Sequence, residues 1–336
     1  MNPLSPVSYN LLSKWTDYFS ESKYIGRFQG GKFYRMVFEW PTTEHYVAKI
    51  WETPEAHACF SRKNLLKLAD EIILLRHERM LRHPGMVRMY RFCIDGEHVG
   101  AMYELQASDS VHNLIPKDSF TWLQRIKVAL GIASLLKFLH TRYSQYSPII
   151  IHNLDAAHIL LDENGYPRLC DFGMITGGIF SNRTVGKNDQ VHGCYGYIDP
   201  SAEEKGDWSD KQDVFAYGVI LLGLITKRIH TEEDRQAHLP SVHEWARREH
   251  EASQSDSDMK AFKRSLVHES LTNDPDFDSD DGVEITAMAM KCMHVCALDR
   301  PSMKQVLMSL FTLPVVKKHA PFLGANKPLH HLKTGS

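Results

Sequence analysis

The feature that most constrains the fold of this chain is the stretch from Pro148 to Gly173, which reads PIIIHNLDAAHILLDENGYPRLCDFG. It contains two short apolar runs, Ile149 to Ile151 and Ile159 to Leu161, each of the length of a buried strand. A polar loop separates the two runs, and the stretch ends in Asp171-Phe172-Gly173. This pattern predicts two short buried strands that hold a polar loop between them.

The stretch resembles the catalytic loop and the metal-binding loop of a protein kinase, which read H-R-D-x-x-x-x-N and D-F-G. The flanking residues leave no room for gaps, and the separation of 171 − 153 = 18 residues is the one that the family keeps. The aligned positions are Ile151 for the family's His, His152 for its Arg, Asn153 for its catalytic Asp, Asp155 for its loop Lys and His158 for its metal-binding Asn. The resemblance implies an α+β fold of two lobes: a small β-rich N-lobe with one long helix, and a large, mainly α-helical C-lobe.

Length and composition agree with such a fold. A chain of 336 residues suits one large domain or two lobes that share an interface. Its 43% hydrophobic and 24% charged residues are typical of a globular protein. A net charge of −2 gives no reason to expect nucleic acid or an anionic membrane as a partner. The six cysteines include no C-x-x-C, which indicates reduced thiols in an intracellular protein.

The sequence also bears on location. The first residues, MNPLSPVSYNLLSK, lack the apolar core of a signal peptide, and Asn2 excludes N-myristoylation. The longest nearly apolar run, Val214 to Thr226, has 13 residues, which are too few to span a bilayer. We therefore expect a cytoplasmic protein without direct membrane insertion, which reaches the plasma membrane only where a partner recruits it.

The first part of the chain resembles the start of plant receptor-like kinase domains. From Trp15 onward it predicts a short helix, a strand, a glycine turn and a second strand. The glycine turn corresponds to the phosphate loop G-x-G-x-x-G-x-V, whose glycines let the backbone close over phosphates. Gly26 and Gly31 are in place, but Phe28 replaces the middle glycine and Phe33 replaces the valine.

The next two elements are expected to supply an ion pair. The predicted strand from His45 to Trp51 carries Lys49, which matches the lysine that binds the α- and β-phosphates. A long helix over about Ala56 to Leu81 should supply its glutamate partner, either Glu71 or Glu78. In the family, an apolar residue stands four positions after this glutamate, on the same face of the helix. Leu75 stands four positions after Glu71, whereas Arg82 stands four positions after Glu78, so we choose Glu71.

The strand from Val99 to Leu105 should lead to the hinge, with Tyr103 at the gatekeeper position and the backbone of 104–106 facing adenine. The resemblance implies ATP and magnesium as cofactors, with Asp171 and His158 at the metal positions. Implied nucleotide contacts are Gly26, Gly31, Phe33, Val47, Lys49, Glu71, Glu104, Leu105 and Leu160. The alternative is a structural role in which Lys49 and Glu71 only tie the helix to the sheet.

The second half of the chain predicts the C-lobe. Residues 121–140 carry apolar residues at helical spacing and predict a core helix, and 213–228 match a further family helix closely. Residues 174–192 would form the activation segment, with Thr176, Ser181 and Thr184, and Asp299-Arg300-Pro301 would begin the last helix. The expected divisions are an N-terminal extension (1–14), an N-lobe (15–105), a C-lobe (106–315) and a flexible tail (316–336).

The substitutions in the loop argue against ordinary catalysis. Asn153 has no basic lone pair at neutral pH and cannot accept the proton of a substrate hydroxyl. His158 offers a nitrogen to magnesium, which prefers oxygen ligands, and Asp155 places negative charge near the transferring phosphoryl group. Phe33 and Val47 add bulk over the adenine site. These changes disfavour both ATP and magnesium.

We therefore interpret the chain as a pseudokinase that acts as a scaffold or adaptor for receptor kinases or immune receptors. Leu75, Phe172 and Ile151 would stack into a hydrophobic spine without any phosphorylation, which suits a protein that presents a fixed surface. The alternative is an active serine/threonine kinase with a non-standard catalytic loop. In that case Asp155, two residues from Asn153, would be the surrogate base.

Overall fold

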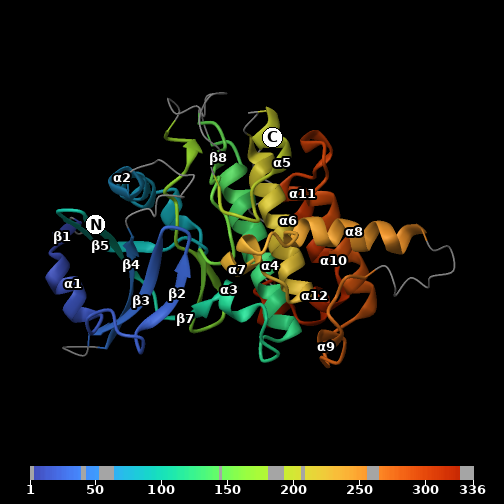
Figure 1. The fold of residues 1–336 in the computed structure, drawn as a ribbon, viewed down its shortest axis with the longest axis horizontal. Coiled ribbons are helices and arrows are strands. Elements are labelled where there is room, and N and C mark those ends of the chain that lie inside the picture. The colour runs from blue at the N-terminus through green and yellow to red at the C-terminus, as the bar shows by residue number, and fades with distance from the viewer. Residues whose placement is uncertain are drawn as a thin grey trace. The chain divides into compact units, whose positions relative to one another are not determined.

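The computed structural model describes residues 4–38, 43–52, 64–143, 146–180, 193–205, 209–255 and 265–325. The chain forms two compact units, which are described one at a time. The first comprises Met1–Leu114 and Phe138–Asp213, and the second comprises Ile115–Lys137 and Val214–Ser336. Figure 1 shows the elements of both. The predicted lobe boundary between positions 105 and 106 stays a prediction.

A six-stranded sheet with the order β1-β5-β6-β4-β3-β2 dominates the start of the first unit. Its neighbours pair antiparallel except β1 and β5, which run parallel. One face buries Met36, Ala48, Cys93 and Met102 together with Leu12 from the short helix α1. The bounds are β1 Ser5–Val7, α1 Tyr9–Trp15, β2 Tyr24–Phe28, β3 Gly31–Phe38, β4 Glu44–Trp51, β5 Arg88–Asp95 and β6 His98–Glu104.

The N-terminal segment differs from the prediction. The expected helix after Trp15 is wrong, because α1 ends at that residue and Asp17 to Phe19, which follow the capping residue Thr16, adopt left-handed backbone angles. Thr16 ends the helix by bonding its hydroxyl back to the carbonyls of Leu12 and Ser13. The extension before residue 15 is also structured in its described part, since β1 adds a strand to the sheet.

The helix that carries Glu71 is α2, Asn64–Leu75, which packs against β5 and β6. The predicted start at Ala56 lies outside the described residues. The predicted end at Leu81 is wrong, because the α-helix stops six residues earlier and a 3-10 turn, Met80–Arg82, follows. The guanidinium of Arg79 donates to the carbonyls of Phe138 and Thr141, each at 2.7 Å, and this tertiary contact holds the chain in a turn.

The polar loop of the first unit lies between two short strands, as the apolar runs predicted. These are β8 (Ile149–Ile150) and β9 (Ile159–Asp162), and β9 is buried throughout. Strand β9 is the centre of a three-stranded sheet, whereas β8 pairs with β11. The remaining elements of this unit are β7 Ala107–Ser110, α3 Val111–Leu114, β10 Pro167–Leu169, β11 Thr176–Gly177 and α5 Pro200–Lys205.

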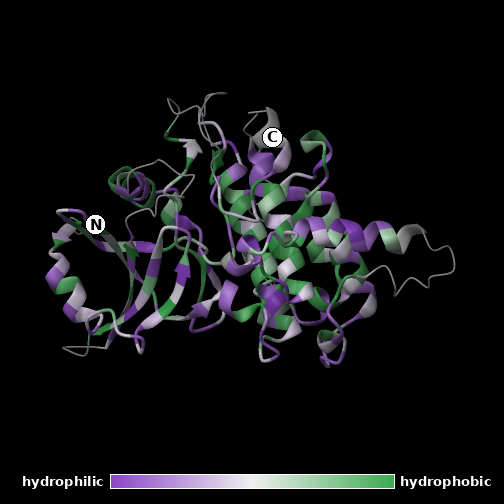
Figure 2. Cartoon of the chain, viewed as in Figure 1, coloured by the Kyte–Doolittle hydropathy of each residue, from purple (hydrophilic) through white to green (hydrophobic). Residues whose placement is uncertain are grey.

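The second unit is helical. The predicted core helix is α4, Trp122–His140, and the second predicted helix is α6, Asp210–Thr226; both extend into the first unit. Figure 2 shows hydrophobic residues gathered on these two helices, whereas α8 is largely hydrophilic. Arg125 of α4 is buried and donates to the carbonyls of Phe120 and Leu224, each at 2.7 Å, which joins α4 to α6. The other helices are α7 Glu232–Gln236, α8 Val242–Ser255, α9 Glu269–Thr272 and α10 Ser279–Cys292.

The end of the chain corrects a further expectation. Asp299-Arg300-Pro301 does precede a helix, α11 (Met303–Thr312), but α11 is not the last one. Two short helices follow, α12 (Pro314–Lys318) and α13 (Ala320–Leu323), which bury Val315, Val316 and Leu323. The flexible tail expected from position 316 therefore does not begin there, and 326–336 lie outside the described residues. None of the helices in the described ranges combines the length and apolar character that a bilayer span requires.

Candidate functional site

A buried ion-pair network joins the sheet, α2 and the Asp171 loop. Lys49 Nζ of β4 lies 2.5 Å from Glu71 Oε1 and 3.0 Å from Asp171 Oδ2, and none of these side chains is exposed by more than 4%. Glu71, and not Glu78, is therefore the partner of the lysine. Its carboxylate also accepts from the Tyr103 hydroxyl at 2.5 Å and from the Phe172 backbone N–H at 2.9 Å. Three donors thus satisfy Glu71 without any ligand.

Burial acts to raise the pKa of both carboxylates, whereas the charge of Lys49 acts to lower it. Burial raises the pKa of Glu71; Lys49 opposes this shift and Asp171 adds to it. Burial also acts to raise the pKa of Asp171, but the charge of Lys49, with His158 and the Gly173 N–H, outweighs it and holds that pKa well below its usual range. Asp171 is therefore a fixed carboxylate, as a metal ligand would have to be.

The oxygens of Asp171 are nevertheless occupied by protein groups. Oδ1 accepts from Asn153 Nδ2 at 2.9 Å and from the Gly173 N–H at 2.8 Å. Oδ2 contacts Lys49 Nζ, and His158 Nε2 lies 3.2 Å away, although it is not aligned for a hydrogen bond. Magnesium needs oxygen ligands in nearly octahedral array and gives up its waters reluctantly. An amide, an ammonium and an imidazole around one carboxylate do not fit that ion.

The loop residue Asp155 turns back onto its own loop. Its Oδ1 accepts from the His158 backbone N–H at 2.8 Å and lies 3.3 Å from His158 Nδ1. Cys194 adds a third side chain, with its sulfur 4.0 Å from His158 Nδ1 and 3.6 Å from the Asn153 carbonyl. Burial raises the pKa of the Cys194 thiol well above its usual value, and the charge of Asp155 adds to the shift. All three side chains are buried.

The backbone of the polar loop is anchored by one buried carboxylate. Asp213 accepts from the backbone N–H groups of Ile151, at 2.9 Å, and His152, at 3.1 Å, and His140 Nε2 lies 2.9 Å from it. These bonds hold His152 at a φ of 63°, a left-handed conformation that costs a non-glycine residue roughly 1 kcal/mol. The loop geometry is therefore fixed by contacts within this unit.

The segment that corresponds to the phosphate loop carries two buried aromatic side chains, Phe28 and Phe33. Phe28 is only 2% exposed, and its ring centroid lies 4.7 Å from that of Phe33 and 5.2 Å from that of His158. Lys49 Nζ sits 5.2 Å from the centre of the Phe28 ring. A side chain at Gly31 would collide with Phe28 and with the Ile50 carbonyl, so this glycine serves close packing. The Lys49 ammonium thus lies beside this ring as well as beside the carboxylates of Glu71 and Asp171.

The turn and the first strand of this loop are tied down at both ends. Gln29 accepts a hydrogen bond from the Tyr195 N–H at 3.0 Å. Asn113 Nδ2 of α3 donates to the Ile25 carbonyl at 2.7 Å, and a Cβ built at Gly26 would lie 3.2 Å from Ser110 Oγ. Strand β2 therefore rests directly on the segment after the hinge. A nucleotide between them would have to displace these contacts, so the residues present do not fit ATP.

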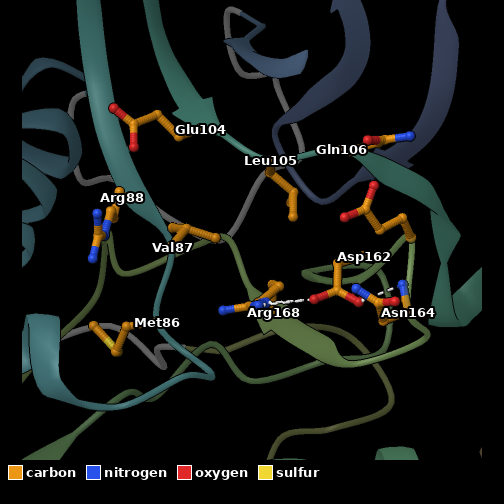
Figure 3. Close-up of a pocket in the computed structure, with 10 residues that line it drawn as sticks. Met86, Val87, Arg88, Glu104, Leu105, Gln106, Asp162, Asn164 and Arg168 are labelled. Carbon is orange, nitrogen blue, oxygen red and sulfur yellow. Dashed lines mark hydrogen bonds and ion pairs between the residues drawn. The ribbon is translucent and has the colours of Figure 1, made fainter. Parts of the chain in front are cut away.

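The other residues predicted to contact nucleotide lie in two different surroundings, some in the core and some beside a cavity. Val47, Leu160 and Tyr103 are fully buried, and Val47 pairs with Tyr103 across β4 and β6. Glu104 and Leu105 line a polar cavity of about 370 Å³ with Met86, Arg88, Asp162 and Arg168 (Figure 3). Two of these lining residues form an ion pair, with Arg168 Nη2 2.8 Å from Asp162 Oδ2 (Figure 3). Glu104, Leu105 and Gln106, the residues whose backbone was expected to face adenine, all line this cavity.

Of the predicted activation segment, 174–192, the structure describes only residues 174–180. Thr176 is half-buried in β11, and its hydroxyl lies 2.7 Å from His152 Nε2. Ser181 and Thr184 lie outside the described residues. His152 stands where the family has the arginine that receives an activation-loop phosphate, and here it contacts a threonine of the same segment.

Comparison with known proteins decides the family. A family profile described as "Protein kinase domain" matches residues 19–312, most of the chain. The chain belongs to the protein kinase domain family. The resemblance drawn from Pro148 to Gly173 and the predicted α+β class are thereby confirmed.

Similar proteins from Arabidopsis thaliana support this assignment. "Probable serine/threonine-protein kinase PBL6" is 30% identical over 230 residues, which are 67% of this chain and 50% of that protein. "Serine/threonine-protein kinase PBS1" is 32% identical over 182 residues, 53% of this chain and 39% of that protein. "Receptor-like protein kinase HERK 1" is 28% identical over 304 residues, 88% of this chain and 33% of that protein. The kinase chain spans a third to a half of the length of these relatives.

Several residues that shape the site escaped the sequence reasoning. Asn113 and Gln29 close the phosphate loop, and neither belongs to a motif. The Tyr103 position was predicted, but its bond to Glu71 was not. Cys194 was not among the candidate residues predicted from the sequence, because its approach to Asp155 and His158 depends on the fold.

Proposed function

We propose that this protein kinase domain is catalytically impaired and acts as a scaffold or adaptor that binds other proteins. The observation that carries the proposal is the state of Asp171. Its carboxylate, which would hold the catalytic metal, is bonded to Asn153, Gly173 and Lys49. Asn153, at the position of the catalytic Asp, thus donates a hydrogen bond to Asp171, at the metal-binding position.

The chemistry of the loop supports this proposal. Phosphoryl transfer in this family depends on positioning and charge neutralisation, and the catalytic base adds about 10²–10⁴-fold. Asn153 cannot accept a proton at neutral pH. Asp155, the candidate surrogate base, is buried and accepts from the His158 backbone N–H. A carboxylate held in this way is not available to a substrate hydroxyl.

An active serine/threonine kinase is the second candidate. The relatives that are named serine/threonine kinases favour it, as does the close pairing of Lys49 with Glu71. The closed phosphate loop favours the scaffold, because Phe28 would have to leave its buried place before a nucleotide could enter. The Lys49–Glu71 pair then has the structural role of joining α2 to the sheet.

Partners and location follow from the same reasoning. A kinase fold that needs no nucleotide to hold its shape can present a constant surface to receptor kinases or immune receptors of its signalling system. We propose a cytoplasmic location, with recruitment to the plasma membrane through such a partner. The activation segment, with Thr176, Ser181 and Thr184, would then be a substrate of a partner kinase rather than a device for self-activation.

The test is a phosphotransfer assay on the purified chain with radiolabelled ATP and either magnesium or manganese. We expect no incorporation into a generic substrate, or into the chain itself, above that of the Asp171→Ala variant; a catalytically competent relative is the positive control. Asn153→Asp alone should not restore transfer, because the other loop positions remain unsuited. Robust transfer that Asp171→Ala abolishes would establish the active kinase, and its loss in Asp155→Asn would identify the surrogate base.

A further inference from the structure

Three buried metal-ligating side chains converge beside the polar loop. Asp155 and His158 come from the loop, and Cys194 comes from the segment that follows residue 192. One carboxylate oxygen, one imidazole nitrogen and the sulfur all lie within 4.8 Å of one another. The Asn153 carbonyl oxygen faces the same space, 2.8 Å from His158 Nδ1 and 3.6 Å from the Cys194 sulfur.

This spacing is close to what a small tetrahedral ion requires. Bonds of about 2.0 Å to oxygen and nitrogen and about 2.3 Å to sulfur place tetrahedral ligands roughly 3.3–3.6 Å apart. Asp155 Oδ1 and His158 Nδ1 are already 3.3 Å apart, and the sulfur lies 4.0 Å from the same nitrogen. The sulfur therefore has to move inward by less than about 1 Å, which a side-chain rotation supplies. The Asn153 carbonyl oxygen, 2.8 Å from His158 Nδ1, has to move outward by about 0.5 Å.

We propose that Asp155, His158 and Cys194 form a binding site for a divalent transition-metal ion of the zinc type, with the Asn153 carbonyl as the fourth donor. The mixed oxygen, nitrogen and sulfur donors select such an ion over magnesium or calcium. Charge also balances: binding displaces the thiol proton of Cys194 to solvent, and the thiolate and the Asp155 carboxylate then neutralise the two positive charges. Four protein donors with no open position describe a structural site.

The position of Asp171 supports the assignment. If His158 binds metal through Nδ1, its ring proton must lie on Nε2, which is 3.2 Å from Asp171 Oδ2. A carboxylate that receives the outer N–H of a metal-bound histidine fixes the tautomer and the ring orientation. This Nε2 makes no aligned hydrogen bond among the described residues, so it is not already bonded to another partner there. Asp171 would thus be an outer partner of the ion, not its ligand.

Such an ion would join two segments that are far apart in the sequence. The loop of 153–158 and the residues after 192 would be held together without phosphorylation of the intervening segment. The site does not depend on the proposed scaffold role, since a metal bound here neither supplies nor replaces the missing catalytic base. Metal binding and phosphotransfer can therefore fail separately in experiments.

The experiment uses the full chain, stripped of metal with a chelator under reducing conditions and titrated with Co²⁺. We expect one ion per chain and a sulfur-to-cobalt charge-transfer absorption that Zn²⁺ abolishes by competition. Cys194→Ser should remove this band, and His158→Gln or Asp155→Asn should weaken Co²⁺ binding by about tenfold or more. Circular dichroism of each variant shows whether it has folded.

Matched controls are two cysteines elsewhere. Cys292→Ser removes another buried thiol, and Cys296→Ser removes an exposed thiol next to His294; both should keep the band. Absence of a charge-transfer band in the wild-type chain would overturn the proposal. So would a band that survives Cys194→Ser or disappears in Cys296→Ser. If Cys194→Ser does not fold, unchanged cobalt affinity in both His158→Gln and Asp155→Asn would reject the site equally well.

Discussion

Lys49 is the residue on which the buried charges of the first unit depend. It faces Glu71 and Asp171 at 2.5 Å and 3.0 Å, and its ammonium also lies 4.2 Å from the centre of the Trp51 ring. A buried carboxylate without a cation is costly, because desolvation is no longer offset. A structural role for this lysine would account for its presence beside an altered catalytic loop.

Lys49→Met should therefore lower the free energy of unfolding by about 3–5 kcal/mol, since it leaves two buried carboxylates without their cation. The double variant Lys49→Met with Glu71→Leu should regain part of this loss, because it removes one of the stranded charges. Urea denaturation measures both. The control is Lys32→Met, which breaks a partly exposed pair with Glu52 and should cost under about 1 kcal/mol. Equal costs at positions 49 and 32 would contradict a structural role for the buried network.

At the scale of helices and strands, the sequence predicted those elements whose apolar residues are buried along most of their length. The apolar runs at 149–151 and 159–161 and the helix over 121–140 could be read directly, because such residues have to be buried in any fold. The parallel pairing of β1 with β5 could not, since it joins residues 86 positions apart (91 − 5 = 86). The early end of α2 likewise depends on Arg79 reaching carbonyls near position 140.

For the candidate site too, the sequence predicted some features and not others. Motif alignment identified Lys49, Glu71 and Asp171, which the structure brings together, because their spacing along the chain is a family property. It did not reveal that Asn113 donates to the Ile25 carbonyl, or that Asp155 accepts from the backbone of its own loop. Both depend on side-chain choices among several rotamers, which only the packed surroundings decide.

Helices α10 and α12 are joined by one acidic residue. Asp278 caps α10 by accepting from the Asp280 N–H at 2.8 Å, and Asp281 Oδ2 accepts from the Val315 N–H in the first turn of α12 at 3.0 Å. Asp281 is fully buried, and its other oxygen has no hydrogen-bond partner among the described residues. Burial raises the pKa of Asp281 to about 6; the Val315 N–H opposes this shift, and the charges of Asp278 and Asp280 add to it.

This raised pKa predicts a pH dependence of stability. Between pH of about 4 and about 6 the folded chain keeps a proton on Asp281 that the unfolded chain has released, so the residue's stabilising contribution is lost as pH rises through 6. Asp281→Asn should remove this part of the slope and gain about 1 kcal/mol at pH 7, with the gain vanishing near pH 4. Denaturant titrations across this range measure it. The control is Glu97→Gln at an exposed position, whose free energy of unfolding should vary with pH as in the wild type. If the wild type and Asp281→Asn show the same pH dependence, the prediction is contradicted.

At the scale of the whole molecule, the stability of an ordinary nucleotide-binding protein rises with ligand concentration, since a ligand that binds only the folded state adds RT ln(1 + [L]/Kd). Here the phosphate loop is closed by protein contacts, and Phe28 occupies the place beside Lys49. Under the proposed scaffold function, the chain's own residues would take the place of the contacts that a nucleotide makes. Its shape should therefore be independent of cellular ATP.

The prediction is that millimolar ATP with magnesium leaves the wild-type Tm unchanged, whereas Phe28→Ala, alone or with Phe33→Val and Val47→Ala, gains an ATP-dependent increase. The Phe28→Ala variant will be less stable without ligand, by about 3–5 kcal/mol, because a buried ring is lost. Each variant is therefore compared with its own ligand-free Tm by thermal shift. Phe120→Ala removes an equally buried ring of the second unit and should lose stability without gaining an ATP response. A strong wild-type shift at micromolar ATP would mean that Phe28 and Asn113 yield readily to nucleotide, and the closed loop would then be one state of an ATP-binding kinase.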